Sequence, residues 1–264
     1  MTINDVLDPD KIALNLRTSR IGRKILVYNS TTSTNDVAAE YARNRKNDGL
    51  VIFAEYQTAG RGRAGAEWVS RPGDSILASI LLTECVLNCE LLSLACGIAV
   101  AEAVTEVAGV QAKVKWPNDV LINGRKAAGI LVEAKSAPQT QGGICIVGVG
   151  INCHQTQDSF DTSLQAVATS IDMESHCVCN RNLVAKMFMV SMDNWLAAAQ
   201  QSPEAVTEGW SRLSAQMGQH LTVVYNGAQF SGICAGIDPE KGLTLRLDSG
   251  GVRFFDAVHT TIVK

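Results

Sequence analysis

The spacing of hydrophobic and polar residues divides the first half of the chain into alternating strands and helices. Residues 49–57 and 75–82 are rich in β-branched and large apolar side chains, which is typical of buried strands. Apolar residues recur with the period of a helix at 34–45 and, over a longer stretch, at 91–109. A first strand is predicted at 24–28. Strands and helices therefore mix within one domain.

The second half continues this mixture. Residues 113–134 alternate as strands do, and the dipeptide Asn123-Gly124 between them is typical of a two-residue hairpin turn. Residues 142–152 predict another interior strand, whose glycines indicate a close approach of the backbone to another group. The helical period returns at 181–199 and 206–213. The predicted fold class is α+β, with a mixed sheet packed by helices.

The last part of the chain has a different character. The helical pattern stops near Gln216, and short apolar runs separated by turn residues follow to the C-terminus. Such spacing predicts a small all-β barrel. Two domains are expected, at 1–216 and 217–264.

Composition and charge exclude several classes of protein. The 264 residues carry 23 basic and 26 acidic side chains, so the positive excess that binds nucleic-acid backbones is absent. The apolar stretch 91–110 contains Glu102 and Glu106, which favours a buried helix over a membrane span. The N-terminus lacks the order of a signal peptide, and the expected location is the cytoplasm.

Cysteine and histidine spacing gives no sign of a metal or a nucleophile. The 8 cysteines form no CxxC repeat and have no histidine at zinc-finger spacing, so a zinc site is not expected. They are expected to be reduced and buried, because several lie in apolar runs. The 4 histidines have no serine or cysteine partner in a known motif, which leaves hydrolase chemistry without support.

A glycine- and arginine-rich loop is the most informative segment. From Gln57, the chain runs through Gly60, Arg61, Gly62 and Arg63, so exposed backbone N–H groups alternate with fixed positive charge. Such a loop suits an anionic ligand and can close over it as a mobile lid. The alternative is a solvated, disordered stretch. Its place between two predicted buried strands favours a ligand loop.

Three further segments place polar side chains at the ends of predicted strands or helices. Lys115-Trp116-Pro117-Asn118-Asp119 delivers an amide and a carboxylate to a strand tip, or is an ordinary strand-to-turn transition with a packed tryptophan. Lys126 follows the hairpin turn and could supply a cation to the same ligand, or serve only solubility. Ser33-Thr34-Asn35 is explained by helix capping alone.

Taken in order, these segments resemble the biotin protein ligase family. The resemblance rests on Ser33-Thr34-Asn35, the Gln57–Gly65 loop, Lys115–Asp119, the stretch Arg125–Glu133, and Gly148-x-Gly150-Ile151-Asn152. It runs from about residue 25 to the C-terminus. It implies a catalytic domain like that of class II synthetases, at 1–216, and an SH3-like β-barrel at 217–264.

The resemblance also implies a reaction and its residues. Biotin attacks the α-phosphate of ATP to give biotinyl-5'-adenylate, and a lysine of a biotin carboxyl carrier protein takes the biotinyl group; Mg²⁺ accompanies ATP. The implied catalytic residues are Arg61, Arg63, Lys126 and Asp119, the last to position the carrier lysine or a magnesium ion. The implied biotin-binding residues are Ser33, Thr34, Asn35, Gln57, Gly60, Arg61, Gly62, Arg63, Lys126, Gly129, Gly148 and Gly150. The implied ATP-binding residues are Arg61, Arg63, Lys115, Trp116, Asn118, Lys126 and Asn152.

Two differences from the family bear on these expectations. Many relatives carry another arginine where this chain has Ala66, which puts retention of the intermediate in question. About two dozen residues precede the first strand, too few for a helix-turn-helix domain, so DNA-binding repressor activity is not expected.

Two other functions stay open. One is a lipoate or octanoate ligase or transferase relative, and the other is a non-catalytic biotin-binding sensor. A homodimer is expected from the family alone.

Overall fold

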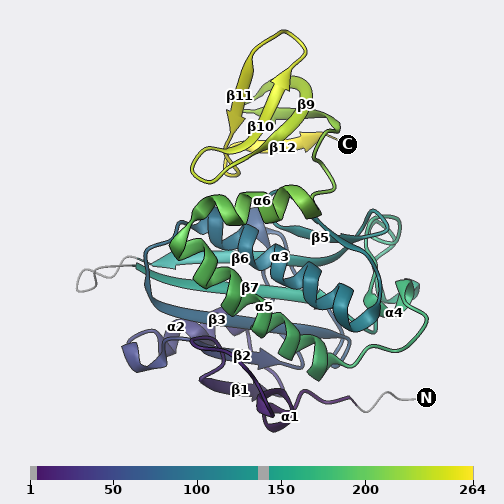
Figure 1. The fold of residues 1–264 in the computed structure, drawn as a ribbon. Helices are drawn as coiled ribbons and strands as arrows, with labels where there is room; N and C mark the ends of the chain where they lie inside the picture. The colour runs from purple at the N-terminus through teal and green to yellow at the C-terminus, as the bar shows by residue number, and fades with distance from the viewer. Residues whose placement is uncertain (1–4, 136–142, 264) are drawn as a thin grey trace.

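A computed structural model describes residues 5–135 and 143–263. Its main element is a seven-stranded sheet with the order β1-β2-β3-β7-β6-β5-β4 (Figure 1). Strands β1 and β2 pair in parallel, and the other neighbours are antiparallel. The strands are β1 (Lys24–Tyr28), β2 (Leu50–Ala54), β3 (Ser75–Cys85), β4 (Ala112–Lys115), β5 (Asp119–Ile122), β6 (Arg125–Lys135) and β7 (Gly143–Asn152). The mixed sheet confirms the predicted α+β class.

Helices cover both faces of this sheet. Helices α3 (Cys89–Ala108), α5 (Arg181–Gln201) and α6 (Pro203–Leu213) pack on one another over one face (Figure 1). Helix α2 (Thr34–Tyr41) contacts β2, β3 and β7. The alternation of strand side chains explains this division, because Leu50 and Ile52 pack with α2 whereas Val51 and Phe53 join the larger core.

Helix α3 forms the centre of the larger core. The Asn88 side chain caps its start by accepting a hydrogen bond from Leu91 N at 2.7 Å, and Gly109 ends it in the left-handed conformation. Among the described residues it alone has the length and apolar composition of a membrane span, and 67% of its most apolar window is buried. This matches the predicted buried helix.

Element boundaries depart from the sequence pattern where turns intervene. The helix predicted at 34–45 ends at Tyr41, and the strand predicted at 49–57 ends at Ala54. The segment 113–134 forms three strands rather than one hairpin, because Trp116–Asn118 makes a second turn between β4 and β5. The turn at Asn123-Gly124 is confirmed, with φ of 49° and 80°. Residue 142 lies outside the described residues.

Short elements without a clear period were not predicted. They are the helices α1 (Pro9–Ala13) and α4 (Ile171–Glu174) and the 3₁₀ helices η1 (Arg45–Asn47), η2 (Arg63–Gly65) and η3 (Gln157–Ser159). Each is too short to show a helical hydrophobic period.

A second, five-stranded antiparallel sheet follows α6, with the order β11-β10-β9-β8-β12 (Figure 1). Its strands are β8 (His220–Tyr225), β9 (Ala228–Asp238), β10 (Gly242–Leu247), β11 (Val252–Phe255) and β12 (Thr260–Val263). Within residues 143–263, no pairing joins β11 to β12, so the sheet is open where a barrel was predicted. Gln216, at the predicted boundary, is buried, and its Oε1 accepts a hydrogen bond from Trp116 N at 2.6 Å.

The cysteines are all free thiols, as predicted. The expectation that they are all buried is wrong for two of them. Cys177 is exposed in the connection between α4 and α5, and Cys89 is half-buried because it is the first residue of α3.

Candidate active site

Three glycines on two neighbouring strands form the floor of a cavity of about 260 Å³. Gly129 of β6 pairs with Gly150 of β7, and Gly148 lies two residues earlier on β7. A Cβ on Gly148 would stand 2.4 Å from Asn35 Oδ1, and one on Gly150 would stand 2.4 Å from Trp68 Cε2. Glycine is therefore required here for the walls of the cavity to approach the sheet.

The start of α2 forms one wall. Ser33 caps the helix by accepting a hydrogen bond from Asn35 N at 3.3 Å. Thr34 donates from its backbone N (2.7 Å) and its hydroxyl (3.0 Å) to Gln57 Oε1. Beneath them, the Ser79 hydroxyl of β3 lies 2.5 Å from Asn35 Oδ1 and 2.7 Å from Thr34 Oγ1. The capping residues thus also present a fixed array of polar groups to the cavity.

The glycine-rich loop forms the opposite wall as a narrow hairpin. Gly60 O accepts a hydrogen bond from Trp68 N at 3.0 Å, and Gly62 N donates to Ala66 O at 2.6 Å. The chain reverses at Ala64, whose φ of 52° is left-handed. The loop therefore has a defined backbone, in contrast to the solvated, disordered alternative.

Arg61 fastens the loop to α2. Its guanidinium donates to both carboxylate oxygens of Asp36, at 2.7 and 3.0 Å, and lies 3.7 Å from Glu133 Oε1. The hydrogen bond to Asp36 raises the pKa of Arg61, and the same bond lowers the pKa of Asp36. The arginine stays charged at the edge of the cavity.

Arg63 joins the loop to two distant parts of the chain. Its guanidinium donates to the backbone oxygen of Ala257, in the turn between β11 and β12, at 2.7 Å and to Asn118 Oδ1 at 3.4 Å. Burial lowers the pKa of Arg63, and the charges of Glu90 and Asp119 oppose this shift. A half-buried cation at the cavity favours an anionic ligand beside it.

Trp68 is a lining residue that the sequence reasoning missed. Its indole lies against Gly150 and Gly129, and the ammonium of Lys126 lies 5.7 Å from the centre of its ring. Its buried indole N–H has no hydrogen-bond partner among the described residues. The sequence signal that could have identified Trp68 is its place as an aromatic residue just after the glycine-rich loop.

Lys126 lies at the cavity beside Asp119. Its ammonium is 2.6 Å from Asp119 Oδ1, and its side chain is 38% exposed. The backbone of Lys126 is held on its other edge, because its N donates to Val167 O at 2.7 Å and its O accepts from Thr169 N at 2.8 Å. The lysine thus projects from a fixed strand into a site lined by other cations.

Comparisons with known proteins agree with this arrangement. The sequence pattern of the "Biotin/lipoate A/B protein ligase family" matches residues 27–152. A biotin–[acetyl-CoA-carboxylase] ligase of Mycobacterium tuberculosis is 32% identical, over 98% of this chain and 99% of its own length. The chain belongs to the biotin/lipoate protein ligase family. A bifunctional ligase/repressor BirA of Bacillus spizizenii is 29% identical, over 95% of this chain and 78% of its own.

The fold is also that of a solved member of the family. The biotin protein ligase from Aquifex aeolicus in complex with biotin and ATP superposes with a TM-score of 0.77 at 21% identity. The match covers 92% of this chain and 99% of the other.

Most of the residues expected from the biotin protein ligase resemblance meet in the cavity. Those that line it are Ser33, Thr34, Asn35, Gln57, Arg61, Gly62, Arg63, Asn118, Asp119, Lys126, Gly129, Gly148 and Gly150. Gly60 lines an adjoining groove of about 1030 Å³. This groove shares the glycine-rich loop with the cavity and extends to Asp256–Val258, between β11 and β12. The cavity therefore adjoins a larger groove that is bordered by the glycine-rich loop, the start of α3 and the turn after β11.

Three expected nucleotide-binding residues lie outside the linings of the cavity and the groove. Trp116 is buried, and its indole N–H donates to Glu90 Oε1 at 2.8 Å. Asn152 donates to Thr169 O at 2.9 Å, and Lys115 lies half-buried on the edge strand β4. In this structure these residues contact neighbouring protein groups.

Proposed function

We propose that this protein is an ATP-dependent ligase that activates biotin as biotinyl-5'-adenylate and transfers the biotinyl group to a carrier-protein lysine. One observation carries the proposal: a glycine-floored cavity brings the polar wall of α2 together with Arg63 and Lys126. These segments are far apart in the sequence. The names of the relatives support the same activity.

The first step joins two anions. A biotin carboxylate oxygen forms a bond to the α-phosphorus of ATP, and the bond from that phosphorus to the pyrophosphate oxygen breaks. The reactants repel each other, so cations must meet them in a site sheltered from water. Arg61, Arg63 and Lys126 would supply this charge, and each positioned donor contributes about 3–4 kcal/mol.

Biotin would occupy the cavity itself. Its ureido group needs hydrogen-bond partners in a fixed geometry, and Thr34, Asn35 and Gln57 already form a fixed network with Ser79. Its apolar chain would lie along the floor formed by the glycine backbone. The carboxylate would then point toward Lys126.

The nucleotide would enter from the larger groove. That groove reaches the glycine-rich loop and Glu90, Ser93 and Asp256–Val258, whereas Asn118 lines the cavity next to Arg63. Mg²⁺ would arrive with ATP as part of the substrate. Asp119 is a carboxylate in the cavity lining that could contact it.

In the second step, the carrier lysine amine forms a bond to the biotinyl carbonyl carbon, AMP leaves, and the amine gives up a proton. Asp119 already binds one ammonium group, that of Lys126, at 2.6 Å. The same carboxylate would position the incoming lysine.

Pyrophosphate release on mixing the purified protein with ATP, Mg²⁺ and biotin tests this proposal, with lipoate and octanoate run beside biotin. Release with biotin alone is expected. Release only with lipoate or octanoate would make the protein a lipoate or octanoate ligase relative. Tight biotin binding without release would make it a biotin sensor. Either result would overturn the proposal.

A further inference from the structure

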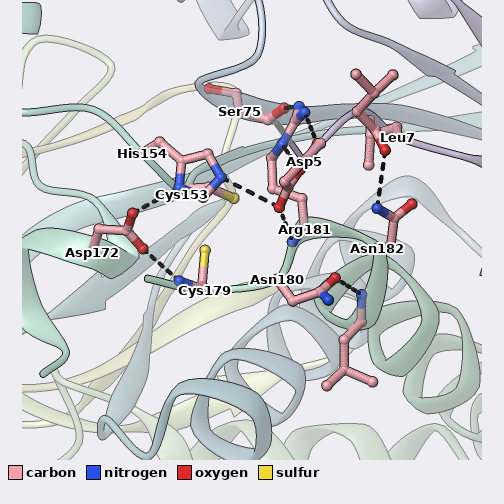
Figure 2. Close-up of polar contacts among 12 residues, drawn as sticks. Asp5, Leu7, Ser75, Cys153, His154, Asp172, Cys179, Asn180, Arg181 and Asn182 are labelled. Atoms are coloured by element: carbon pink, nitrogen blue, oxygen red, sulfur yellow. Dashed lines mark hydrogen bonds and ion pairs between the residues drawn. The ribbon is translucent and has the colours of Figure 1, made fainter. Parts of the chain in front are cut away.

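A second cluster of reactive side chains lies away from the cavity, between the end of β7 and the start of α5. His154, Asp172 and Cys179 each offer one ligand atom there, and these atoms all lie within 4.8 Å of one another (Figure 2). The His154 side chain is 6% exposed, Asp172 is 17% exposed, and Cys179 is buried.

The three residues are held together by short contacts. His154 Nδ1 lies 2.7 Å from Asp172 Oδ2, and Asp172 Oδ1 accepts a hydrogen bond from Cys179 N at 2.8 Å (Figure 2). The backbone N of His154 donates to Asp74 O at 2.9 Å. The donors are therefore ordered before any ligand arrives.

The second ring nitrogen of His154 faces another carboxylate. His154 Nε2 is buried, and Asp5 Oδ2 lies 3.4 Å from it in an ion pair (Figure 2). Asp5 is also paired with Arg181, at 2.8 Å. His154 Nδ1, on the Asp172 side, is therefore the ring nitrogen that an ion held among the three residues would contact.

A second thiol is the sequence neighbour of His154. Cys153 is fully buried, and its Sγ lies 3.6 Å from Ile151 O. It is not one of the three residues whose ligand atoms lie within 4.8 Å of one another. One sulfur, one imidazole nitrogen and one carboxylate oxygen are donors that zinc accepts, and water can take the fourth position.

We propose that His154, Asp172 and Cys179 bind one Zn²⁺ ion, with a water molecule in the fourth position. Zinc takes such ligands at about 2.0–2.3 Å in a tetrahedron, so a small inward movement of the three side chains completes the site. Binding replaces the Cys179 thiol proton and the imidazole proton on His154 Nδ1, which pass to solvent. Sequence spacing did not reveal the site, because its ligands come from three separate segments.

Such an ion would also connect to the catalytic strand. The segment between His154 and Cys179 includes Val167 and Thr169, whose backbone groups hold Lys126 on its outer edge. Zinc at both ends of this segment would limit its movement. The ion would therefore hold in place the segment whose backbone bonds to Lys126.

Zinc binding to the reduced, full-length protein tests the proposal. After equilibration with Zn²⁺ and desalting, we expect about one bound equivalent, and Co²⁺ in place of zinc should give the visible absorption and thiolate charge-transfer bands of a tetrahedral sulfur-ligated site. Little metal retained, or a Co²⁺ spectrum without thiolate bands, would overturn the proposal. This readout needs no variant.

Matched variants locate the ion. Cys179→Ser and Asp172→Asn should each weaken zinc affinity by about tenfold or more, as loss of a ligand requires. Cys234→Ser, a buried free thiol in β9, and Asp158→Asn, an exposed carboxylate, should leave it unchanged. Equal affinity in the two pairs of variants would contradict the proposed site.

Discussion

The ammonium of Lys126 lies 2.6 Å from the carboxylate of Asp119, on the neighbouring strands β5 and β6. The pair lies at the cavity, where the incoming substrates are themselves anions. A biotin carboxylate or an α-phosphate can therefore replace Asp119 as the partner of Lys126. Once displaced, Asp119 is free to receive the ammonium of the carrier lysine, so the same pair can serve both half-reactions.

Removing the Lys126 side chain should slow the first half-reaction. Lys126→Ala is expected to reduce the single-turnover rate of adenylate formation by well over tenfold, because a positioned cation stabilises the charge that develops at the phosphorus. The fold should persist, since this side chain is 38% exposed. Rapid-quench measurement of pyrophosphate gives the rate.

Lys113→Ala serves as the control for this change. Lys113 is an exposed lysine on β4, so its loss removes the same charge outside the cavity. The control should match the wild-type rate. Unchanged single-turnover kinetics in Lys126→Ala would remove this lysine from the mechanism.

Filling the floor of the cavity should weaken biotin binding. The new methyl group of Gly150→Ala would stand 2.4 Å from the Trp68 ring, so the indole must move or the strand must shift. Overpacking of this kind costs about 1–3 kcal/mol of folding stability. An indole displaced into the cavity would take space that biotin needs, so we expect about tenfold weaker biotin binding by calorimetry.

Gly143→Ala is the matched control on the same strand. Its Cβ would meet atoms no nearer than 3.6 Å, an ordinary contact distance. If both variants bound biotin as tightly as the wild type, the glycine floor would not be the biotin site.

Restoring an arginine in the loop should improve retention of the intermediate. Ala66 lines the cavity and has φ −65° and ψ 146°, which an arginine adopts without strain. One added charged hydrogen bond is worth about 1.5–3 kcal/mol, so Ala66→Arg should lower carrier-free, steady-state pyrophosphate release by about tenfold while leaving the first burst intact.

Ala66→Gln separates charge from side-chain bulk in this experiment. It should release pyrophosphate at close to the wild-type rate. An equal decrease in both variants would assign the effect to steric cover of the cavity, against a role for the positive charge.

The stability of the main domain should depend on Asp193 at acidic pH. Its carboxylate accepts hydrogen bonds from the backbone N atoms of Ser19, Arg20 and Ile21 at 2.7–2.9 Å. Burial alone would raise the pKa of Asp193, but these bonds outweigh burial and hold the pKa below the ordinary value of 3.8. Its contribution to stability is therefore complete above pH 3.8 and is lost as the pH falls through the lower pKa of the folded state.

Asp193→Asn should lower the free energy of unfolding by about 1.5–3 kcal/mol at pH 7, as expected for hydrogen bonds to a charged group. The difference from wild type should shrink as the pH falls below 3.8. Urea unfolding at pH 7 and at a pH below 3.8 measures this difference in unfolding free energy, and the exposed Asp158→Asn serves as the control. A difference that grew on acidification would contradict the assigned sign.

Local patterns were sufficient to predict the elements that position the site. The β-branched runs marked β2 and β3, and Asn123-Gly124 marked the turn before Lys126, because these signals depend on neighbouring residues alone. The glycines of β7 indicated a close approach without identifying its partner. The structure supplies Asn35 and Trp68 as that partner.

Contacts between distant segments could not be read from the sequence. Lys126 reaches Asp119 through a register shift between β5 and β6, and Arg63 reaches Ala257 across 194 positions of chain. For Trp116 the family resemblance implied a nucleotide contact, which stays a prediction, whereas the hydrogen bond from its buried indole to Glu90 came from the structure alone. Sheet order and side-chain packing decide such cases, and neither has a local signal.

Intact mass spectrometry of a biotin carboxyl carrier domain, incubated with the protein, biotin, ATP and Mg²⁺, tests the central claim most directly. The account predicts a mass gain of one biotinyl group on a single lysine, dependent on both ATP and biotin. A carrier domain that stays unmodified while the protein remains folded and binds biotin would contradict it.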